Sequence, residues 1–173
     1  MIIILEGNEC NFKTTVAEKL SKSLEIPVVK GSSFENAKCT NLQLYKHFVK
    51  LASMDDVIID RSWISNRVYA TLYEDYAILT EEQREDIEET VDKNTVAVLV
   101  YLHADEDVLV ERLRERGDEY VDESMIGKIN DTYAEAIEDT RLHTINYDTG
   151  EFSSDRIASG LTDLYRVLKG LYG

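Results

Sequence analysis

Residues 2–15 read Ile2-Ile3-Ile4-Leu5-Glu6-Gly7-Asn8-Glu9-Cys10-Asn11-Phe12-Lys13-Thr14-Thr15. An uninterrupted apolar run bounded by a glycine is typical of a strand that is buried on both faces of a parallel sheet. The polar loop that follows leads into Val16-Ala17-Glu18-Lys19-Leu20, which we expect to be helical. The loop therefore lies at a helix N-terminus, where unpaired N–H groups and the positive end of the helix dipole bind anions.

This loop matches most of the phosphate-binding pattern G-x-x-x-x-G-K-[ST], in which a lysine reaches the terminal phosphates and a hydroxyl binds Mg²⁺. Gly7, Lys13 and Thr14 fit the pattern, but Phe12 stands where the second glycine is expected. A positive φ at that position costs a bulky residue about 1–2 kcal/mol. The alternatives are a strand-turn-helix without a ligand and a site that has lost its function. We predict a site for ATP and Mg²⁺ that consists of Gly7, Asn8, Cys10, Asn11, Phe12, Lys13, Thr14 and Thr15.

The composition limits the partners that the chain can have. With 19 Lys and Arg residues against 34 Asp and Glu residues, the net charge is −15, which argues against binding to nucleic acid or to an anionic membrane. A length of 173 residues fits one domain. Cys10 and Cys39 are too few for a disulfide framework and lack metal-site spacing, which suits a reducing cytoplasm. The apolar start is too short for a signal peptide, and we expect no membrane span.

Apolar patterns along the chain predict alternating strands and helices. Further strands are expected near residues 26–29, 57–59, 96–102 and 144–147. Capping-box patterns of Ser32 with Glu35 and of Thr80 with Gln83 each predict a helix start. The alternation indicates a single α/β domain, residues 1–173, with a parallel sheet of about five strands and helices on both faces. The expected helices cover residues 14–24, 32–53, 81–92, 105–115, 123–142 and 157–171, with a further one that continues through 70–79.

Two patterns concern the packing of these helices. Between Glu74 and Asp92, nine acidic residues accompany a single base, Arg84, and we expect a solvated helix face. The last helix carries an apolar stripe that we expect to lie in the core, made of Ile157, Leu161, Leu164, Leu168 and Leu171.

A second polar cluster follows the apolar run Val57-Ile58-Ile59. Asp60 and Arg61 come at the predicted C-terminal end of that strand, which is the edge where open α/β sheets hold ligands. A carboxylate there can orient Mg²⁺, and a guanidinium can hold phosphate oxygens in a bidentate fork. The alternative is an exposed salt bridge at a strand end.

These stretches resemble two kinase families. Glu6-Gly7, Glu9 and Lys13-Thr14-Thr15, followed by Asp60-Arg61, are similar to the thymidylate kinases, whose signatures are E-G-x-D and D-R-[YF]-x-x-S-x-x-A-Y. The deoxynucleoside kinases, with I-E-G-N and E-R-S-x-Y-S-D-R, are also similar. Gly7-Asn8 and Arg61-Ser62 favour the second family, whereas Asp60, Asn66 and Tyr69 favour the first. Either resemblance implies a P-loop NTPase three-layer sandwich, and the short segment from Lys30 to Asp60 suggests a phage-type or otherwise divergent member.

The resemblance also implies roles for individual residues. Glu9 would lie near the sugar 3′-hydroxyl and the metal, Arg61 would hold the acceptor phosphate, and Tyr69 would pack against the deoxyribose. Asn66 would read the base edge, since an amide can pair with both N3–H and a carbonyl of thymine or uracil. Arg67 is either a further phosphate or base contact or a solvated helix arginine. Tyr45 and Phe48, three residues apart, form either a wall of the acceptor pocket or part of the core.

Three arginines lie within five residues at Arg112, Arg114 and Arg116. The first and third share a helix face, and Arg114 points elsewhere. By the resemblance, an Arg-bearing lid at about residues 112–123 closes over the phosphates and stabilises transition-state charge, with Arg114 as a further contact to ATP. The alternative is pairing with the neighbouring Glu111 and Glu115.

Together with the resemblance to the thymidylate kinases, the sequence predicts transfer of the γ-phosphoryl group of ATP to a pyrimidine deoxynucleoside monophosphate, thymidylate first. Its expected catalytic residues are Glu9, Lys13, Asp60, Arg61, Arg112 and Arg116, with Mg²⁺ held by Thr14 and Asp60. One alternative is a deoxynucleoside kinase, and another is a nucleotide-binding module without turnover because of Phe12. The expected partners are small nucleotides, a homodimer being compatible with the resemblance, and the expected location is the cytoplasm, that of a host if the chain is viral.

Overall fold

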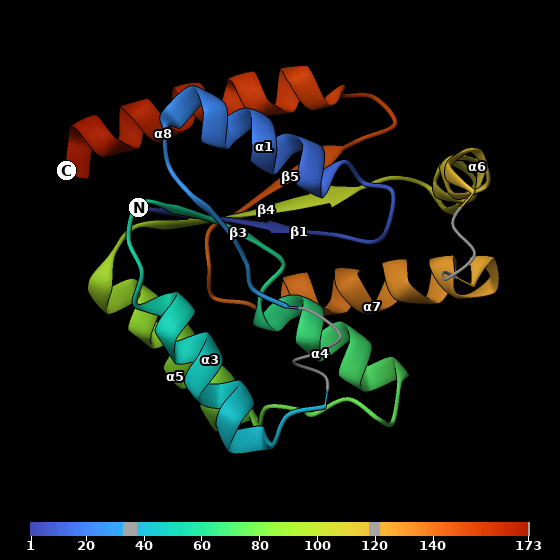
Figure 1. Ribbon diagram of the computed structural model, residues 1–173, viewed down its shortest axis with the longest axis horizontal. Helices are drawn as coiled ribbons and strands as arrows, with labels where there is room; N and C mark the ends of the chain where they lie inside the picture. The colour runs from blue at the N-terminus through green and yellow to red at the C-terminus, as the bar shows by residue number, and fades with distance from the viewer. Residues whose placement is uncertain (33–37, 118–121, 173) are drawn as a thin grey trace.

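Five parallel strands form one sheet in the computed structural model, which describes residues 1–32, 38–117 and 122–172 (Figure 1). The strands are β1 (Ile2–Glu6), β2 (Val28–Lys30), β3 (Val57–Asp60), β4 (Ala97–His103) and β5 (Thr144–Asp148). Their order across the sheet is β2-β3-β1-β4-β5, so that the first strand of the chain is the central one. The predicted α/β fold with a parallel sheet is confirmed.

Helices cover both faces of the sheet (Figure 1). On one face, α1 (Lys13–Leu24) packs against α8 (Ser154–Tyr172). The other face carries α3 (Asn41–Ala52), α4 (Trp63–Leu72), α5 (Glu81–Asn94) and α7 (Ile126–Glu138). Beyond the C-terminal end of β4, α6 (Glu106–Arg116) and the 3₁₀ turn η1 (Glu123–Met125) contact α7. None of the helices in the described residues is long and apolar enough to cross a membrane.

The apolar run of β1 is uninterrupted because both faces of the strand are buried. Ile2 and Ile4 pack in the core on the side of α3, α4, α5 and α7. Ile3 and Leu5 point the opposite way, into the core on the side of α1 and α8. All four side chains are at most 1% exposed. Burial of such a side chain stabilises a fold by about 1.5–3 kcal/mol, so this strand fixes the centre of the sheet.

Three helices differ in extent from the prediction. α3 begins at Asn41, where Thr40 forms a capping box with Gln43, rather than at Ser32. The predicted box at Ser32 includes Glu35, which lies outside the described residues. α4 ends at Leu72 instead of continuing through 70–79, because the backbone of Tyr73 is extended. α7 ends at residue 138 instead of 142.

Two side chains lie in surroundings opposite to those predicted. Leu171 is 70% exposed, because the last turn of α8 extends past the end of the sheet (Figure 1). Glu88, within the acidic run, is only 6% exposed. Its carboxylate accepts hydrogen bonds from Trp63 Nε1 at 3.3 Å, Thr140 Oγ1 at 2.7 Å and the Arg141 N–H at 3.0 Å. The acidic run is therefore not a purely solvated face.

Replacing Glu88 should test this buried carboxylate. Glu88→Ala removes the acceptor for three donors, and we expect the free energy of unfolding to fall by about 2–4 kcal/mol. The control Glu85→Ala, at an exposed position of the same helix, should change it by less than about 0.5 kcal/mol. Urea denaturation followed by circular dichroism measures both changes, and equal values for the two variants would contradict the role of Glu88.

Candidate active site

An open cavity of about 1110 Å³ lies at the carboxyl ends of the central strands, which is where parallel α/β sheets bind ligands. The loop after β1, the end of β3 and parts of α4, α6 and α7 border it. The acidic side chains among its described lining residues are Glu9, Asp60 and Asp122. The basic ones are more numerous: Lys13, Lys30, Arg61, Arg112 and Arg116. On a chain with a net charge of −15, this local excess of positive charge indicates a site for anions.

The first residue of the loop after β1 has a backbone conformation that requires glycine. Gly7 has φ 141°, and a Cβ at this position would lie 2.0 Å from the Leu102 carbonyl oxygen. Asn8 then ties the loop to α7, because its Nδ2 donates to the Ile126 carbonyl and to Asn130 Oδ1, both at 2.9 Å. The loop is thus held against β4 at Gly7 and against α7 at Asn8.

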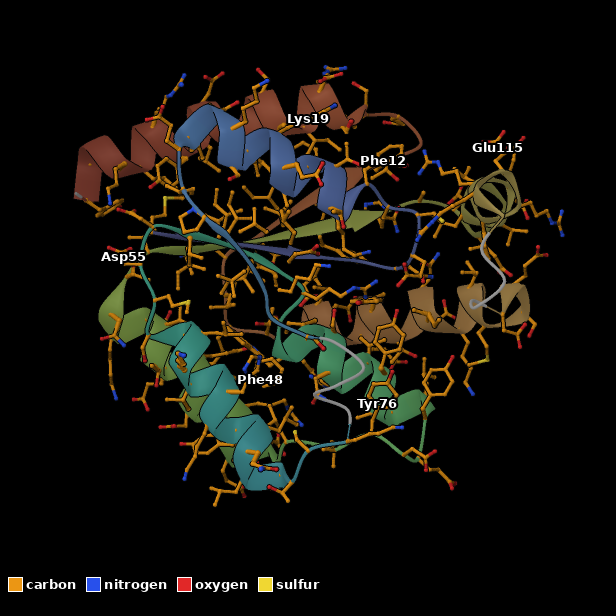
Figure 2. The ribbon with its side chains drawn as sticks, viewed as in Figure 1. Phe12, Lys19, Phe48, Asp55, Tyr76 and Glu115 are labelled. Carbon is orange, nitrogen blue, oxygen red and sulfur yellow. The ribbon has the colours of Figure 1, made fainter. Side chains whose placement is uncertain are left out.

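Phe12 adopts the backbone that the phosphate-binding pattern assigns to glycine. Its φ is 60° and its ψ is 9°, and it is the N-cap residue of α1 (Figure 2). The ring contacts the apolar core on the side of α8, and the Arg112 guanidinium lies over it, 4.3 Å from its centroid. Such a cation–π contact contributes about 0.5–2 kcal/mol, which offsets the cost of the left-handed backbone.

Lys13 is buried at the bottom of the cavity. It is 6% exposed, and its Nζ donates to the Asn8 carbonyl at 2.5 Å. Burial, reinforced by the neighbouring Arg61, lowers the pKa of Lys13 to about 8 against the opposing effect of Glu9. A phosphate bound beside Nζ would favour the charged ammonium form.

Thr14 and Asp60 meet although they are far apart in the sequence. Thr14 Oγ1 donates to Asp60 Oδ2 at 3.2 Å. The other carboxylate oxygen, Asp60 Oδ1, is buried and has no hydrogen-bond partner among the described residues. A hydroxyl and an unsatisfied carboxylate oxygen are the hard oxygen ligands that Mg²⁺ prefers when nucleotide phosphates complete its shell. These residues therefore fit the ion that the sequence predicts.

Arg61 contacts both the loop after β1, through Glu9, and helix α4, through Tyr69. Its backbone has φ 66°, and its N–H donates to the Leu5 carbonyl at 3.0 Å. The guanidinium pairs with Glu9 and donates to the hydroxyls of Tyr69 at 3.3 Å and Tyr133 at 3.2 Å. Burial alone would raise the pKa of Glu9, but Arg61, Lys13 and Arg116 hold it below its ordinary value. Glu9 is therefore a charged partner of Arg61.

A group of three tyrosines forms the aromatic wall of the cavity. The rings of Tyr69, Tyr73 and Tyr76 have centroids 5.9–6.2 Å apart, and all three line the cavity. Met125 and Ile129 also border it. Of these three tyrosines, Tyr69 alone was predicted from the sequence to contact the acceptor. The other two were missed because a helix was predicted through 70–79, whereas α4 ends at Leu72. The chain beyond it brings the ring of Tyr76, labelled in Figure 2, onto that of Tyr69.

Several predicted contacts lie away from the cavity. Phe48 is 0% exposed in the core, and Tyr45 bonds with Asp86 on the neighbouring helix α5. Asn66 is 3% exposed and its Nδ2 donates to the Ala77 carbonyl at 3.0 Å, because the segment after α4 folds over it. Arg67 pairs with Asp139. None of the four lines the cavity, so the structure gives their predicted contacts with the acceptor no support. It favours the alternatives of core packing for Phe48 and of a helix arginine for Arg67.

The three arginines of the predicted lid have separate environments. Arg112 donates to the Cys10 carbonyl at 3.3 Å and to the Thr149 Oγ1 and carbonyl at 2.8 and 2.6 Å, so it links the loop to the end of β5. Arg114 forms an exposed ion pair with Glu123 at 2.8 Å and does not line the cavity. Arg116 lines it. Of the predicted lid, residues 118–121 lie outside the described residues.

Comparison with known proteins identifies the family to which the chain belongs. The family model for deoxynucleoside kinases matches residues 36–159. The chain belongs to the deoxynucleoside kinase family. A relative described as SPbeta prophage-derived uncharacterized protein YorR, from Bacillus subtilis (strain 168), is 52% identical over 160 residues, covering 92% of this chain and 96% of the relative. The prediction of a kinase is confirmed, and the family is the one that the sequence analysis gave as the alternative to the thymidylate kinases. A monophosphate acceptor, thymidylate included, stays a prediction.

Solved structures agree with this assignment. The crystal structure of YorR in complex with phosphorylated GDP is 49% identical to this member of the deoxynucleoside kinase family, with a TM-score of 0.92 and 98% of each chain covered. Deoxyadenosine kinase from M. mycoides with bound dCTP is 18% identical, with a TM-score of 0.64 and coverage of 96% of this chain and 100% of the other. At that identity, the likeness concerns the fold. The prophage origin of YorR agrees with the expected phage-type member.

The buried Lys13 should make stability depend on pH. In the unfolded chain the lysine keeps its proton up to a pKa near 10.5, but the folded protein releases it above about 8. The nucleotide-free protein therefore gains stability from this group as pH rises between these values. Lys13→Met removes the buried charge, so its melting temperature should exceed that of the wild type most at pH 7, and the difference should shrink from pH 8 to 10.

Thermal unfolding across this pH range measures the effect. The control Lys22→Met, at an exposed position of the same helix, should show a difference from wild type that does not change in this window. A difference for Lys13→Met that stays constant with pH would contradict the lowered pKa.

Proposed function

We propose that this protein transfers the γ-phosphoryl group of ATP to a deoxynucleoside monophosphate. The observation that carries the proposal is the cavity itself, in which five basic side chains face three acidic ones within a chain of net charge −15. The loop and Lys13 would suffice to bind the triphosphate of ATP. The further bases, Lys30 and Arg61 beside the tyrosines, are best explained by an acceptor that also carries a phosphate.

At the donor end, the amides at the start of α1 and the Lys13 ammonium would bind the β- and γ-phosphates. Arg116 lines the same cavity and would stabilise charge on the migrating group. An oxygen of the acceptor phosphate forms the new bond to the γ-phosphorus as the bond to the β–γ bridging oxygen breaks, and ADP leaves. No covalent enzyme intermediate is needed, because positioning and charge neutralisation supply the catalysis.

Mg²⁺ belongs to the same proposal. Thr14 and the unsatisfied Asp60 oxygen would hold the ion, which, when bound, neutralises phosphate charge. Among the described residues, no group of three His, Cys, Asp or Glu side chains could hold a metal ion. Mg²⁺ in kinase sites is usually held by one or two protein side chains together with substrate phosphates, so the nucleotide would supply the rest of the coordination.

At the acceptor end, Arg61 would hold the phosphate and the tyrosines Tyr69, Tyr73 and Tyr76 would stack with the base. Aromatic stacking accepts any base because every base has a π-face. The preference for thymidylate rested on Asn66, which is buried elsewhere. Since YorR is in complex with phosphorylated GDP, we propose deoxyguanylate beside thymidylate as the first acceptors.

A deoxynucleoside kinase is the second candidate, and the family match favours it. An uncharged sugar hydroxyl needs a general base in the cavity. Glu9 is the candidate for this general base, but its pairing with Arg61 holds the pKa of its carboxyl below the ordinary value and makes it a weak base. The third hypothesis, a module disabled by Phe12, has less support, because Phe12 takes the glycine-like backbone. A cytoplasmic location, that of a host if the chain is viral, completes the proposal, and a homodimer is compatible with the family resemblance.

Phosphoryl transfer is tested by ADP release from ATP and Mg²⁺ with all deoxynucleosides and their monophosphates as acceptors. Turnover with monophosphates is expected. Lys13→Met should lower kcat by about a thousandfold, the scale of losing a main electrostatic stabiliser. The control Lys22→Met should keep the wild-type rate. Lys13→Met with unchanged turnover would exclude this mechanism.

The acceptor class is tested with Arg61→Ala. Loss of a charge-assisted contact should raise KM for the monophosphate by about 10–100-fold and change KM for ATP by less than about threefold. The control Arg166→Ala, at an exposed position of α8, should change neither. Phosphorylation of nucleosides that survives Arg61→Ala would instead support the second candidate.

A further inference from the structure

A chain of hydrogen bonds connects the Arg61 guanidinium to a buried carboxylate behind the cavity. Arg61 Nη1 donates to the Tyr133 hydroxyl at 3.2 Å, and that hydroxyl lies 2.7 Å from Ser65 Oγ. Ser65 Oγ in turn donates to Glu6 Oε2. Tyr133, Ser65 and Glu6 are all 0% exposed. The chain joins β1, α4 and α7 at the point where these elements meet.

The directions of these bonds follow from the donors and acceptors. Glu6 receives hydrogen bonds from the N–H and the hydroxyl of both Ser62 and Ser65, so it acts as an acceptor-only carboxylate. Ser65 has a single hydroxyl proton and gives it to Glu6. Tyr133 must therefore donate its own proton to Ser65, which leaves its oxygen to accept from Arg61. Burial raises the pKa of Tyr133 well above its ordinary value, so the phenol keeps that proton.

Of the three side chains that bond with the Arg61 guanidinium, Tyr133 does not line the cavity. Glu9 and Tyr69, which also bond with the guanidinium, both line the cavity. An acceptor that enters the cavity competes with these two contacts. Tyr133 lies behind the guanidinium, and its ring stacks on Tyr101 with centroids 6.0 Å apart. Its position is thus set by the core rather than by the ligand.

We propose that Tyr133 is a positioning residue, which holds the Arg61 guanidinium from behind in the orientation that receives the acceptor. The buried chain to Ser65 and Glu6 fixes the Tyr133 oxygen as an acceptor and prevents the guanidinium from turning away when Glu9 and Tyr69 exchange partners. This inference rests on the proposed function for the identity of the acceptor, but the orientation of Arg61 is a property of the free protein.

Tyr133→Phe tests the proposal because it keeps the ring and removes only the hydroxyl. KM for the acceptor should rise about 5–20-fold, and KM for ATP should stay within about twofold. Ser65→Ala should show the same selective rise, to a smaller extent. The matched control Tyr101→Phe removes a phenol hydroxyl from the ring stacked on Tyr133, outside the chain to Arg61, and should change neither KM.

A second readout needs no turnover. In ¹⁵N NMR spectra of the nucleotide-free protein, the Nη groups of Arg61, assigned with Arg61→Lys, should rotate slowly in the wild type and in Tyr101→Phe but faster in Tyr133→Phe. If the wild type phosphorylates only nucleosides, the proposed function fails, while a selective KM rise for the nucleoside in Tyr133→Phe still supports positioning. Equal changes in both KM values, or unchanged rotation in Tyr133→Phe, would overturn it.

Discussion

The pairing of β1 with β3 is the constraint on which the site depends. In this parallel pair Leu5 lies beside Asp60, and the backbone of Arg61 continues the contact with the Leu5 carbonyl. The carboxyl ends of the two strands therefore meet, and Thr14 reaches Asp60 although 46 residues separate them. β2 adds Lys30 at the same level, beside Asp60. Burial of the apolar side chains of β1 on both faces thus places the polar residues of three segments around one cavity.

The parts of this site that could be predicted from the sequence are those whose geometry is local. The distance along the chain from β1 to Lys13 and the position of Asp60 and Arg61 directly after an apolar strand fix where those side chains emerge. The structure places all of them around the cavity, as expected. Their chemical roles stay predictions, because position alone does not establish what a side chain binds.

The parts that failed depend on packing between distant segments. Asn66 has the residue type of a base reader, but the segment after α4 covers it and takes its amide. Glu88 belongs to an acidic run, yet the loop after α7 supplies donors that make its burial favourable. Tyr73 and Tyr76 become a wall only because α4 ends early. Composition and periodicity within one segment carry no information about such partners, since tertiary contacts override local patterns.

The charge distribution has a consequence for how a nucleotide arrives. At distances beyond the cavity an incoming polyanion meets the field of a chain with a net charge of −15, whereas inside it meets the basic lining residues. Salt affects the repulsion outside the cavity and the attraction inside it differently. At physiological ionic strength the Debye length is about 8 Å, so the long-range repulsion is screened more strongly than the attraction by the partly buried basic side chains. We therefore expect moderate ionic strength to speed the encounter between this protein and a nucleotide. The protein selects its anions by contact within the cavity and not by attraction from solution.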